Sequence, residues 1–211
     1  MPFMGNRIGI YGGSFNPLHL GHLWVGRAAA EAFALDRVLL MPCATSPFKQ
    51  TMRDLLPGGE RLEMIRESVA DDPLFEPCDI EIVRGGVSYA VESVAALRQR
   101  YPEAALFFIL GMDSLLGLSQ WYDVARLLSL CTVITVARPG VPLPAAETLG
   151  FPPETSQNLL KNVIQGRLCD ISSSEIRRRI AENRPIRYLV PCAVEKRIRE
   201  KGFFATAEIE K

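Results

Sequence analysis

The chain has 211 residues, 48% of them apolar, and its 24 basic and 24 acidic residues give a formal net charge of zero. That length and apolar content are enough for one well-buried α/β domain. The balanced charge gives no argument for binding nucleic acid or a membrane surface. Five cysteines without a CxxC pair indicate reduced thiols, and we expect a cytoplasmic protein. Residues 1–6 show no signal-peptide pattern, and no apolar run reaches the ~18 residues of a membrane span.

The first predicted elements form a strand, a glycine-containing turn and a helix. Residues 8–11 are a short apolar run that predicts a buried strand, and residues 23–33, rich in Ala and Leu, predict a helix. Between them, Gly12 and Gly13 would let a ligand approach the backbone and tolerate positive φ. The N-terminus of the following helix offers unpaired N–H groups and the positive end of its dipole. This arrangement predicts a phosphate site.

The only two histidines of the chain, His19 and His22, lie three positions apart at the start of that helix and can face one side. Beside a phosphate cradle, two imidazoles suit a triphosphate by donating hydrogen bonds and, if protonated, charge. A structural histidine that only satisfies a buried hydrogen bond is the alternative. Half of a zinc site is disfavoured because no Cys pair or further His completes the ligand set. Neither a Gly-x-Gly-x-x-Gly nor a Walker motif is present.

The rest of the chain alternates between predicted strands and helices, which indicates a parallel sheet. The predicted strands are residues 37–42, 80–83, 105–110, 132–137 and 163–169. The predicted helices are residues 60–70, a helix capped by Ser88 that ends near residue 101, a short helix ending at residue 130, residues 176–182 behind a capping box at 172–175, and a last helix from Pro191 to Gly202. Residues 43–59 are a predicted loop, and residues 139–153 a surface excursion.

Five polar segments each follow a predicted strand: residues 12–22, 42–49, 111–113, Arg138 and residues 172–177. The carboxyl ends of parallel strands form one crevice in an open sheet, so we expect these segments to meet there. Ser172, Ser173 and Arg177 combine a helix N-terminus with hydroxyls and a guanidinium, which suits phosphate oxygens. An ordinary capping box beside solvated arginines is the alternative.

Residues 12–22 resemble the His-x-Gly-His signature of the nucleotidyltransferase superfamily, and most resemble the start of bacterial nicotinate mononucleotide adenylyltransferases. Ile171 to Arg177 resembles the second signature of that family, Ile-Ser-Ser-Thr-x-x-Arg, with Ser174 in the Thr place. Residues 111–114 match Gly-x-Asp-Ser, residues 138–140 match Arg-Pro-Gly, and residues 46–49 stand where the family has Pro-Pro-His-Lys, with Phe48 replacing the His. The resemblance runs from about residue 7 to residue 203.

The resemblance implies a Rossmann-like α/β fold, a doubly wound and mostly parallel sheet with helices on both faces. We expect a single domain, residues 1–211, whose C-terminal helical part (about residues 171–203) packs on the same sheet. The implied reaction joins ATP and nicotinate mononucleotide to give deamido-NAD and pyrophosphate, in a monomer or a homodimer. Mg²⁺ would be bound mainly through the substrate phosphates, since no acidic cluster offers a cage. Pantetheine-phosphate adenylyltransferase and a non-catalytic nucleotide sensor are the alternatives.

The resemblance and the site chemistry together assign the residues. The expected catalytic residues are His19, His22, Lys49 and Arg177. The expected ATP ligands are these two histidines, Arg177, Gly12, Gly13, Ser14, Phe15, Gly111, Asp113, Arg138, Ile171, Ser172 and Ser173. The expected ligands of the nicotinate nucleotide are Asn16, Lys49, Ser88, Tyr89, Ala90, Trp121 and Tyr122. Backbone donors around Trp121, with no nearby acid, would favour nicotinate over nicotinamide; Trp121 as a plain core residue is the alternative.

Overall fold

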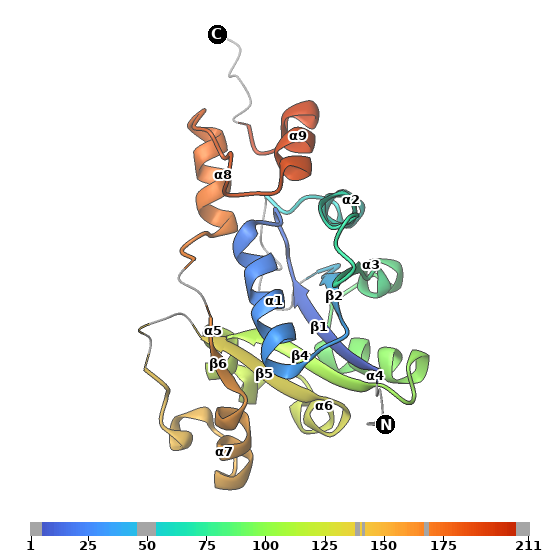
Figure 1. Ribbon diagram of the computed structural model, residues 1–211, viewed down its shortest axis with the longest axis vertical. Helices are drawn as coiled ribbons and strands as arrows, with labels where there is room; N and C mark the ends of the chain where they lie inside the picture. Colours follow the sequence, from blue (N-terminus) through green and yellow to red (C-terminus); the bar gives the residue numbers. More distant parts are fainter. Residues whose placement is uncertain (1–5, 46–53, 138–139, 141, 167–168, 206–211) are drawn as a thin grey trace.

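The computed structural model describes residues 6–45, 54–137, 140, 142–166 and 169–205. Its strands form one six-stranded parallel sheet in the order β3-β2-β1-β4-β5-β6 (Figure 1). They are β1 (Arg7–Gly13), β2 (Arg37–Pro42), β3 (Phe75–Pro77), β4 (Ala105–Gly111), β5 (Thr132–Ala137) and β6 (Val163–Gln165). This is the doubly wound order of dinucleotide-binding folds, whose switch point lies between β1 and β4. The predicted α/β Rossmann-like class is confirmed.

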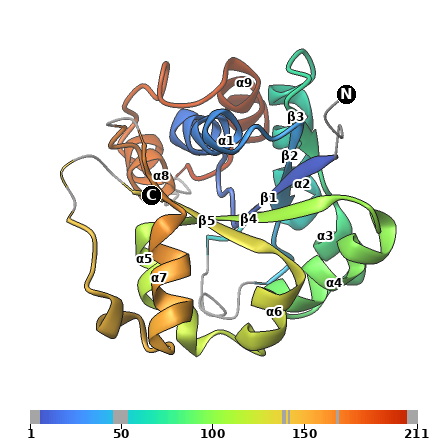
Figure 2. The same ribbon diagram turned by 60° about the horizontal axis from the view of Figure 1, so that its bottom comes forward.

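Helices cover both faces of the sheet (Figure 2). They are α1 (Leu20–Phe33), α2 (Gly58–Ser68), α3 (Ile80–Arg84), α4 (Ala90–Arg100), α5 (Met112–Leu116), α6 (Val124–Leu130), α7 (Pro153–Lys161), α8 (Ser173–Ala181) and α9 (Cys192–Lys201), with short 3₁₀ turns at Leu118–Gln120 and Ala146–Leu149. Side chains of α1, α2, α8 and α9 share one core, and those of α4 to α7 share the other. Across the described part of the chain, no helix is long and apolar enough to cross a membrane.

The strands are buried on both faces, which explains their nearly continuous apolar sequence. In β2, Val38 and Leu40 enter the core beneath α1 and α2, while Leu39 and Met41 enter the core beneath α4. The same alternation runs through β4, where Phe107 faces the first core and neighbouring residues face the second. A side-chain period of two therefore places each apolar residue against a helix on one side or the other.

The segment at residues 80–83 corrects a prediction. Its alternating apolar residues predict a strand, but the chain forms helix α3, closed by the Gly85 N–H donating to the carbonyl of Glu81 at 2.9 Å. Gly85 has φ +69°, a left-handed conformation that stops this short helix. The edge strand that follows α2 is instead β3, residues 75–77, which the sequence analysis missed.

Two further boundaries and one helix differ from the predictions. Ser88 does not cap α4: Tyr89 is the N-cap residue, and the Ser88 hydroxyl accepts the Ala44 N–H at 3.0 Å. Strand β6 stops at Gln165 instead of reaching residue 169. Helix α7 was not predicted at all, although a proline at its first position is a typical helix start.

Gly26 lies where α1 packs closely on the sheet beside Phe75 of β3. A Cβ there would lie 2.7 Å from Cε1 of the buried Phe75 ring, so replacing Gly26 forces the helix away from the strand. We expect Gly26→Ala to lower the free energy of unfolding by ~1–3 kcal/mol, as overpacking does. Gly59→Ala in α2 is the matched control, because a Cβ there meets nothing within 4 Å. Urea denaturation measures both; equal stability of the two variants would contradict the close contact.

Candidate active site

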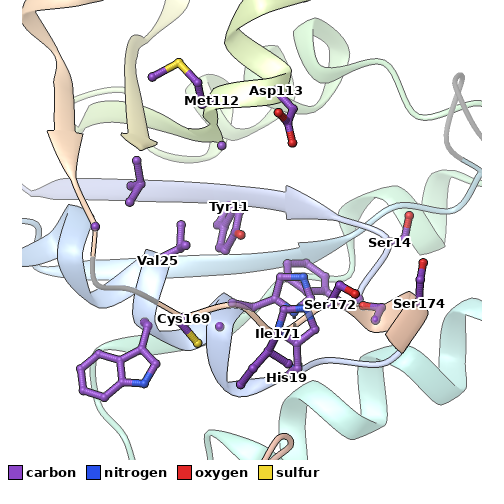
Figure 3. Close-up of a pocket in the computed structure, with 18 of the residues that line it drawn as sticks. Tyr11, Ser14, His19, Val25, Met112, Asp113, Cys169, Ile171, Ser172 and Ser174 are labelled. Atoms are coloured by element: carbon purple, nitrogen blue, oxygen red, sulfur yellow. Dashed lines mark hydrogen bonds between the residues drawn. The ribbon is translucent and has the colours of Figure 1, made fainter. Parts of the chain in front are cut away.

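Two adjoining cavities lie at the carboxyl ends of β1 and β4, the predicted crevice. The first has a volume of about 560 Å³ and the second about 800 Å³. Ser14, which follows β1, and Asp113, which follows β4, line both cavities. Figure 3 shows Asp113 on the opposite side of the first cavity from Ser172 and His19. The prediction that segments after different strands converge is therefore confirmed for the described segments.

Many of the predicted ATP ligands line the first cavity. They are Ser14, Phe15, His19, His22, Gly111, Asp113, Ile171, Ser172, Ser173 and Arg177. Gly12 and Gly13 line the second cavity instead. Neither glycine has a positive φ, since both belong to β1, and the left-handed residue of this turn is Phe15 with φ 44°. Gly12 and Gly13 thus form the end of strand β1, where the backbone borders the second cavity without side chains.

The two histidines form a stacked pair at the start of α1. Their ring centroids lie 3.5 Å apart at an interplanar angle of 21°. His19 is the N-cap residue, and its backbone N–H donates to Nδ1 of His22 at 3.2 Å. Because Nδ1 of His22 accepts this bond, the neutral ring carries its proton on Nε2. Stacked rings this close disfavour a positive charge on both at once.

His19 is buried, with 6% of its surface exposed. Its Nδ1 has no hydrogen-bond partner among the described residues. Burial lowers the pKa of His19 to about 4, so the ring is neutral at pH 7. An unprotonated His19 offers a phosphate a hydrogen bond, but no positive charge.

The second signature is held against the first by hydrogen bonds. The Ser172 hydroxyl caps α8 by accepting the Glu175 N–H at 3.1 Å, as the capping box predicts. The Ser173 hydroxyl donates to the Pro17 carbonyl at 2.9 Å, and Arg177 donates to the Asn16 carbonyl at 2.9 Å. Two helix N-termini, those of α1 and α8, therefore face one cavity, a double site for anionic oxygens.

The second cavity brings together Ser88, Tyr89, Ala90, Trp121 and Tyr122, which the sequence analysis assigned to the nicotinate nucleotide. The Tyr89 and Tyr122 rings pack with centroids 4.7 Å apart. Trp121 is half-buried and meets the core ring of Phe108 edge-on at 6.0 Å, so it belongs both to the core and to the cavity wall. Asn16 lines the first cavity instead, and its side chain bonds the backbone of Asp54 and Leu56.

Comparisons with known proteins match this geometry. A family model described as cytidylyltransferase-like matches residues 10–179. A protein of Citrifermentans bemidjiense named "Probable nicotinate-nucleotide adenylyltransferase" is 40% identical over 95% of this chain and 99% of its own length. A protein of Shouchella clausii with the same name is 36% identical over 94% of this chain and 96% of its own length. The solved Plasmodium falciparum nicotinic acid mononucleotide adenylyltransferase complexed with NaAD has a TM-score of 0.73 at 16% identity, over 94% of this chain and 97% of that one, a likeness of fold. The chain belongs to the nicotinate-nucleotide adenylyltransferase family.

Some assignments made from the family signatures fall on residues that the structure does not describe. Lys49, together with Phe48 where the family has His, and Arg138 lie outside the described ranges. Their predicted roles stay predictions. Within those ranges, no group of three or more His, Cys, Asp or Glu side chains could hold a metal ion.

Glu81 is a cavity residue that the sequence analysis missed, because it lies in the segment wrongly predicted as a strand. The residue is 4% exposed and lines the second cavity, and its carboxyl group accepts the Ser93 hydroxyl at 2.5 Å. Burial raises the pKa of Glu81, and the hydroxyls of Ser93 and Ser88 and the charge of Arg84 partly offset that rise. The prediction that no acid lies near Trp121 is therefore wrong.

Arg61 is the second missed residue, and it supports the loops of both cavities. Only 1% of its surface is exposed. Its guanidinium donates to the carbonyls of Ser14, Cys43 and Leu56 at 2.8, 2.6 and 2.9 Å. Burial lowers the pKa of Arg61, which the neighbouring Cys43 and Glu81 oppose. No pattern marks it in the sequence, where it is one charged residue of a predicted helix.

The buried neutral state of His19 makes stability depend on pH. Burial lowers its pKa from the ordinary value of 6.5 to about 4 in the folded chain, so the unfolded chain takes up the proton first as the pH falls. The contribution is complete above pH 6.5 and is lost between pH 6.5 and 4. We expect the wild type to lose about 2 kcal/mol more than His19→Asn between pH 7.5 and 4.5. Urea denaturation at several pH values measures this, and parallel profiles would refute it.

Proposed function

We propose that the protein transfers AMP from ATP to nicotinate mononucleotide, forming deamido-NAD and releasing pyrophosphate. The observation that carries this proposal is the pair of cavities joined at Ser14 and Asp113. One offers two helix N-termini and a histidine pair, which suit a triphosphate. The other offers aromatic rings, which suit a pyridine ring. The reacting phosphates would meet where the cavities join.

In the proposed reaction a phosphate oxygen of the mononucleotide attacks the α-phosphorus of ATP in line. A new P–O bond forms as the bond to the bridging oxygen of the β-phosphate breaks, and pyrophosphate leaves with that electron pair. The attacking phosphate is already ionised at neutral pH, so the reaction requires positioning and charge stabilisation more than a general base. The cavity geometry supplies the positioning.

Charge stabilisation would come from several groups. His19 and His22 would donate hydrogen bonds to the transferring phosphoryl group, His19 in its neutral form. Arg177 would provide positive charge beside the phosphates, and Lys49 a second cation. Mg²⁺ would be held by the substrate phosphates and water. We assign the carboxyl group of Asp113, which lines the first cavity, as the protein group beside it. Bound there, the ion would neutralise phosphate charge.

The second cavity would read the substituent on the pyridine ring. Backbone N–H groups near Trp121 would donate to a nicotinate carboxylate. Glu81 also lines this cavity, and burial raises the pKa of its carboxyl group. The proposed preference for nicotinate thus rests on the backbone donors near Trp121.

The decisive experiment measures pyrophosphate release from ATP with nicotinate, nicotinamide and pantetheine phosphate acceptors in parallel. We expect nicotinate mononucleotide to give the highest kcat/KM. Equal use of the nicotinate and nicotinamide nucleotides would overturn the nicotinate assignment, and no release with any acceptor would favour a non-catalytic sensor.

Trp121→Ala should raise the KM for the mononucleotide about tenfold and leave the KM for ATP unchanged, because the ring that stacks on the pyridine is lost. A lowered melting temperature with both KM values affected would instead make Trp121 purely structural.

Substitutions in the first cavity should separate binding from rate. Arg177→Ala should weaken ATP with little effect on the mononucleotide, because its guanidinium lines only the first cavity. His19→Ala should lower kcat by ~10²–10³, the effect of losing one transition-state donor. Steady-state kinetics with each substrate varied gives both values. Equal weakening of both substrates by Arg177→Ala, or wild-type turnover by His19→Ala, would remove these roles.

A further inference from the structure

Glu81 is a buried acid in the wall of the second cavity that the proposed reaction does not use. Its carboxyl group accepts the Ser93 hydroxyl at 2.5 Å, and Ser93 is fully buried. Burial raises the pKa of this carboxyl group, and hydrogen bonds from the hydroxyls of Ser93 and Ser88 oppose that rise. A carboxyl group engaged by two buried hydroxyls is suited to holding the surrounding chain in place.

The Ser93 hydroxyl connects α3 to α4 in both directions. Its oxygen accepts the Arg84 guanidinium at 3.0 Å, and its hydrogen is donated to Glu81. Both partners belong to α3, whereas Ser93 lies one turn into α4. A second acceptor for this hydroxyl, the Tyr89 carbonyl, is farther away at 3.4 Å. Loss of the carboxylate would therefore weaken the hold of α3 on the start of α4.

Ser88 connects the same acid to the loop that follows β2. Its hydroxyl accepts the Ala44 N–H at 3.0 Å, which leaves the one hydrogen of that hydroxyl for Glu81. The Ser88 N–H also donates to the Thr45 carbonyl at 2.9 Å, and Thr45 and Val87 form an isolated parallel bridge. The carboxyl group of Glu81 thus lies where three segments meet: α3, the start of α4 and the loop after β2.

These three segments form one side of the second cavity, to which they contribute Cys43, Glu81, Ser88, Tyr89 and Ala90. The Tyr89 ring lies beside the Tyr122 ring, with 4.7 Å between the centroids, and depends on the placement of α4. We propose that Glu81 is a positioning residue, which fixes the start of α4 opposite Tyr122 and so sets the affinity of this cavity for the pyridine mononucleotide. This rests on the proposed function in that the second cavity takes that substrate.

Glu81→Gln tests this role, because glutamine keeps the size of the side chain and replaces one acceptor oxygen with a donor. One of the two serine hydroxyls then loses its acceptor. We expect the KM for nicotinate mononucleotide to rise about tenfold, as for the loss of a hydrogen bond to a charged group. The KM for ATP and kcat should change little, because Glu81 lines only the second cavity. Steady-state kinetics with each substrate varied measures all three values.

Glu92→Gln is the matched control. Glu92 precedes Ser93 on α4, its side chain is 46% exposed and it pairs with the same Arg84 at 3.8 Å, but it lines neither cavity. This variant should leave both KM values unchanged. Ser93→Ala should raise the KM for the mononucleotide as Glu81→Gln does. The two changes combined should raise it little further, because both break the same contact.

Amide hydrogen exchange gives a readout that needs no substrate. In Glu81→Gln the amides of Ala44 and Ser88 should exchange faster than in the wild type, whereas those of α9, which packs in the other core, should not. Unchanged exchange at Ala44 and Ser88 would overturn the proposal. An unchanged KM for the mononucleotide, or a lowered melting temperature with both KM values raised alike, would also overturn it. Faster local exchange in a protein whose wild type does not use nicotinate mononucleotide would overturn only the proposed function.

Discussion

The active site depends on one buried cation. The Arg61 guanidinium donates to backbone carbonyls of two loops: that of Ser14 after β1, and those of Cys43 and Leu56 at the two ends of the connection from β2 to α2. Without the guanidinium, these loop carbonyls would lie buried without hydrogen-bond partners. Leaving a buried carbonyl unpaired costs more free energy than a typical hydrogen bond contributes to stability. A planar guanidinium donates to them from three different nitrogens, whereas a lysine would have to do so from a single nitrogen. The loops that line both cavities thus share a single support inside the protein.

The same constraint places a positive charge behind the anion site. Ser14 borders both cavities, and its carbonyl lies 2.8 Å from the guanidinium. In the loop after β2, the Ala44 N–H donates to the Ser88 hydroxyl, and Ser88 in turn lies beside Glu81. A chain of polar contacts thus runs beneath the floor of the site from the triphosphate side to the pyridine side. Because such networks hold their members in fixed geometry, the two substrates would meet with their phosphates already aligned.

Much of this could be predicted from the sequence, and the failures have physical causes. The strands were found because residues such as Leu39 and Phe108 are buried in a two-sided sheet and read as apolar runs. Residues 80–83 were misread because four alternating residues fit a strand or a helix equally well, and the packing of Glu81 against Ser93 decides. Arg61 carries no local signal. The carbonyls around it come from segments that are remote in sequence and meet only in the fold.

In this site the histidine and the arginines have different roles, which the histidine motif alone did not suggest. A protonated His19 would be attractive beside a triphosphate, yet burial holds its pKa at about 4. Its neutral ring is instead suited to a hydrogen bond that strengthens as charge builds on the transferring group. Permanent charge is left to guanidinium groups, which cannot lose their protons, at Arg177 within the cavity and Arg61 behind it. Because His19 is already neutral at pH 7, its protonation should contribute nothing to phosphate binding near neutral pH.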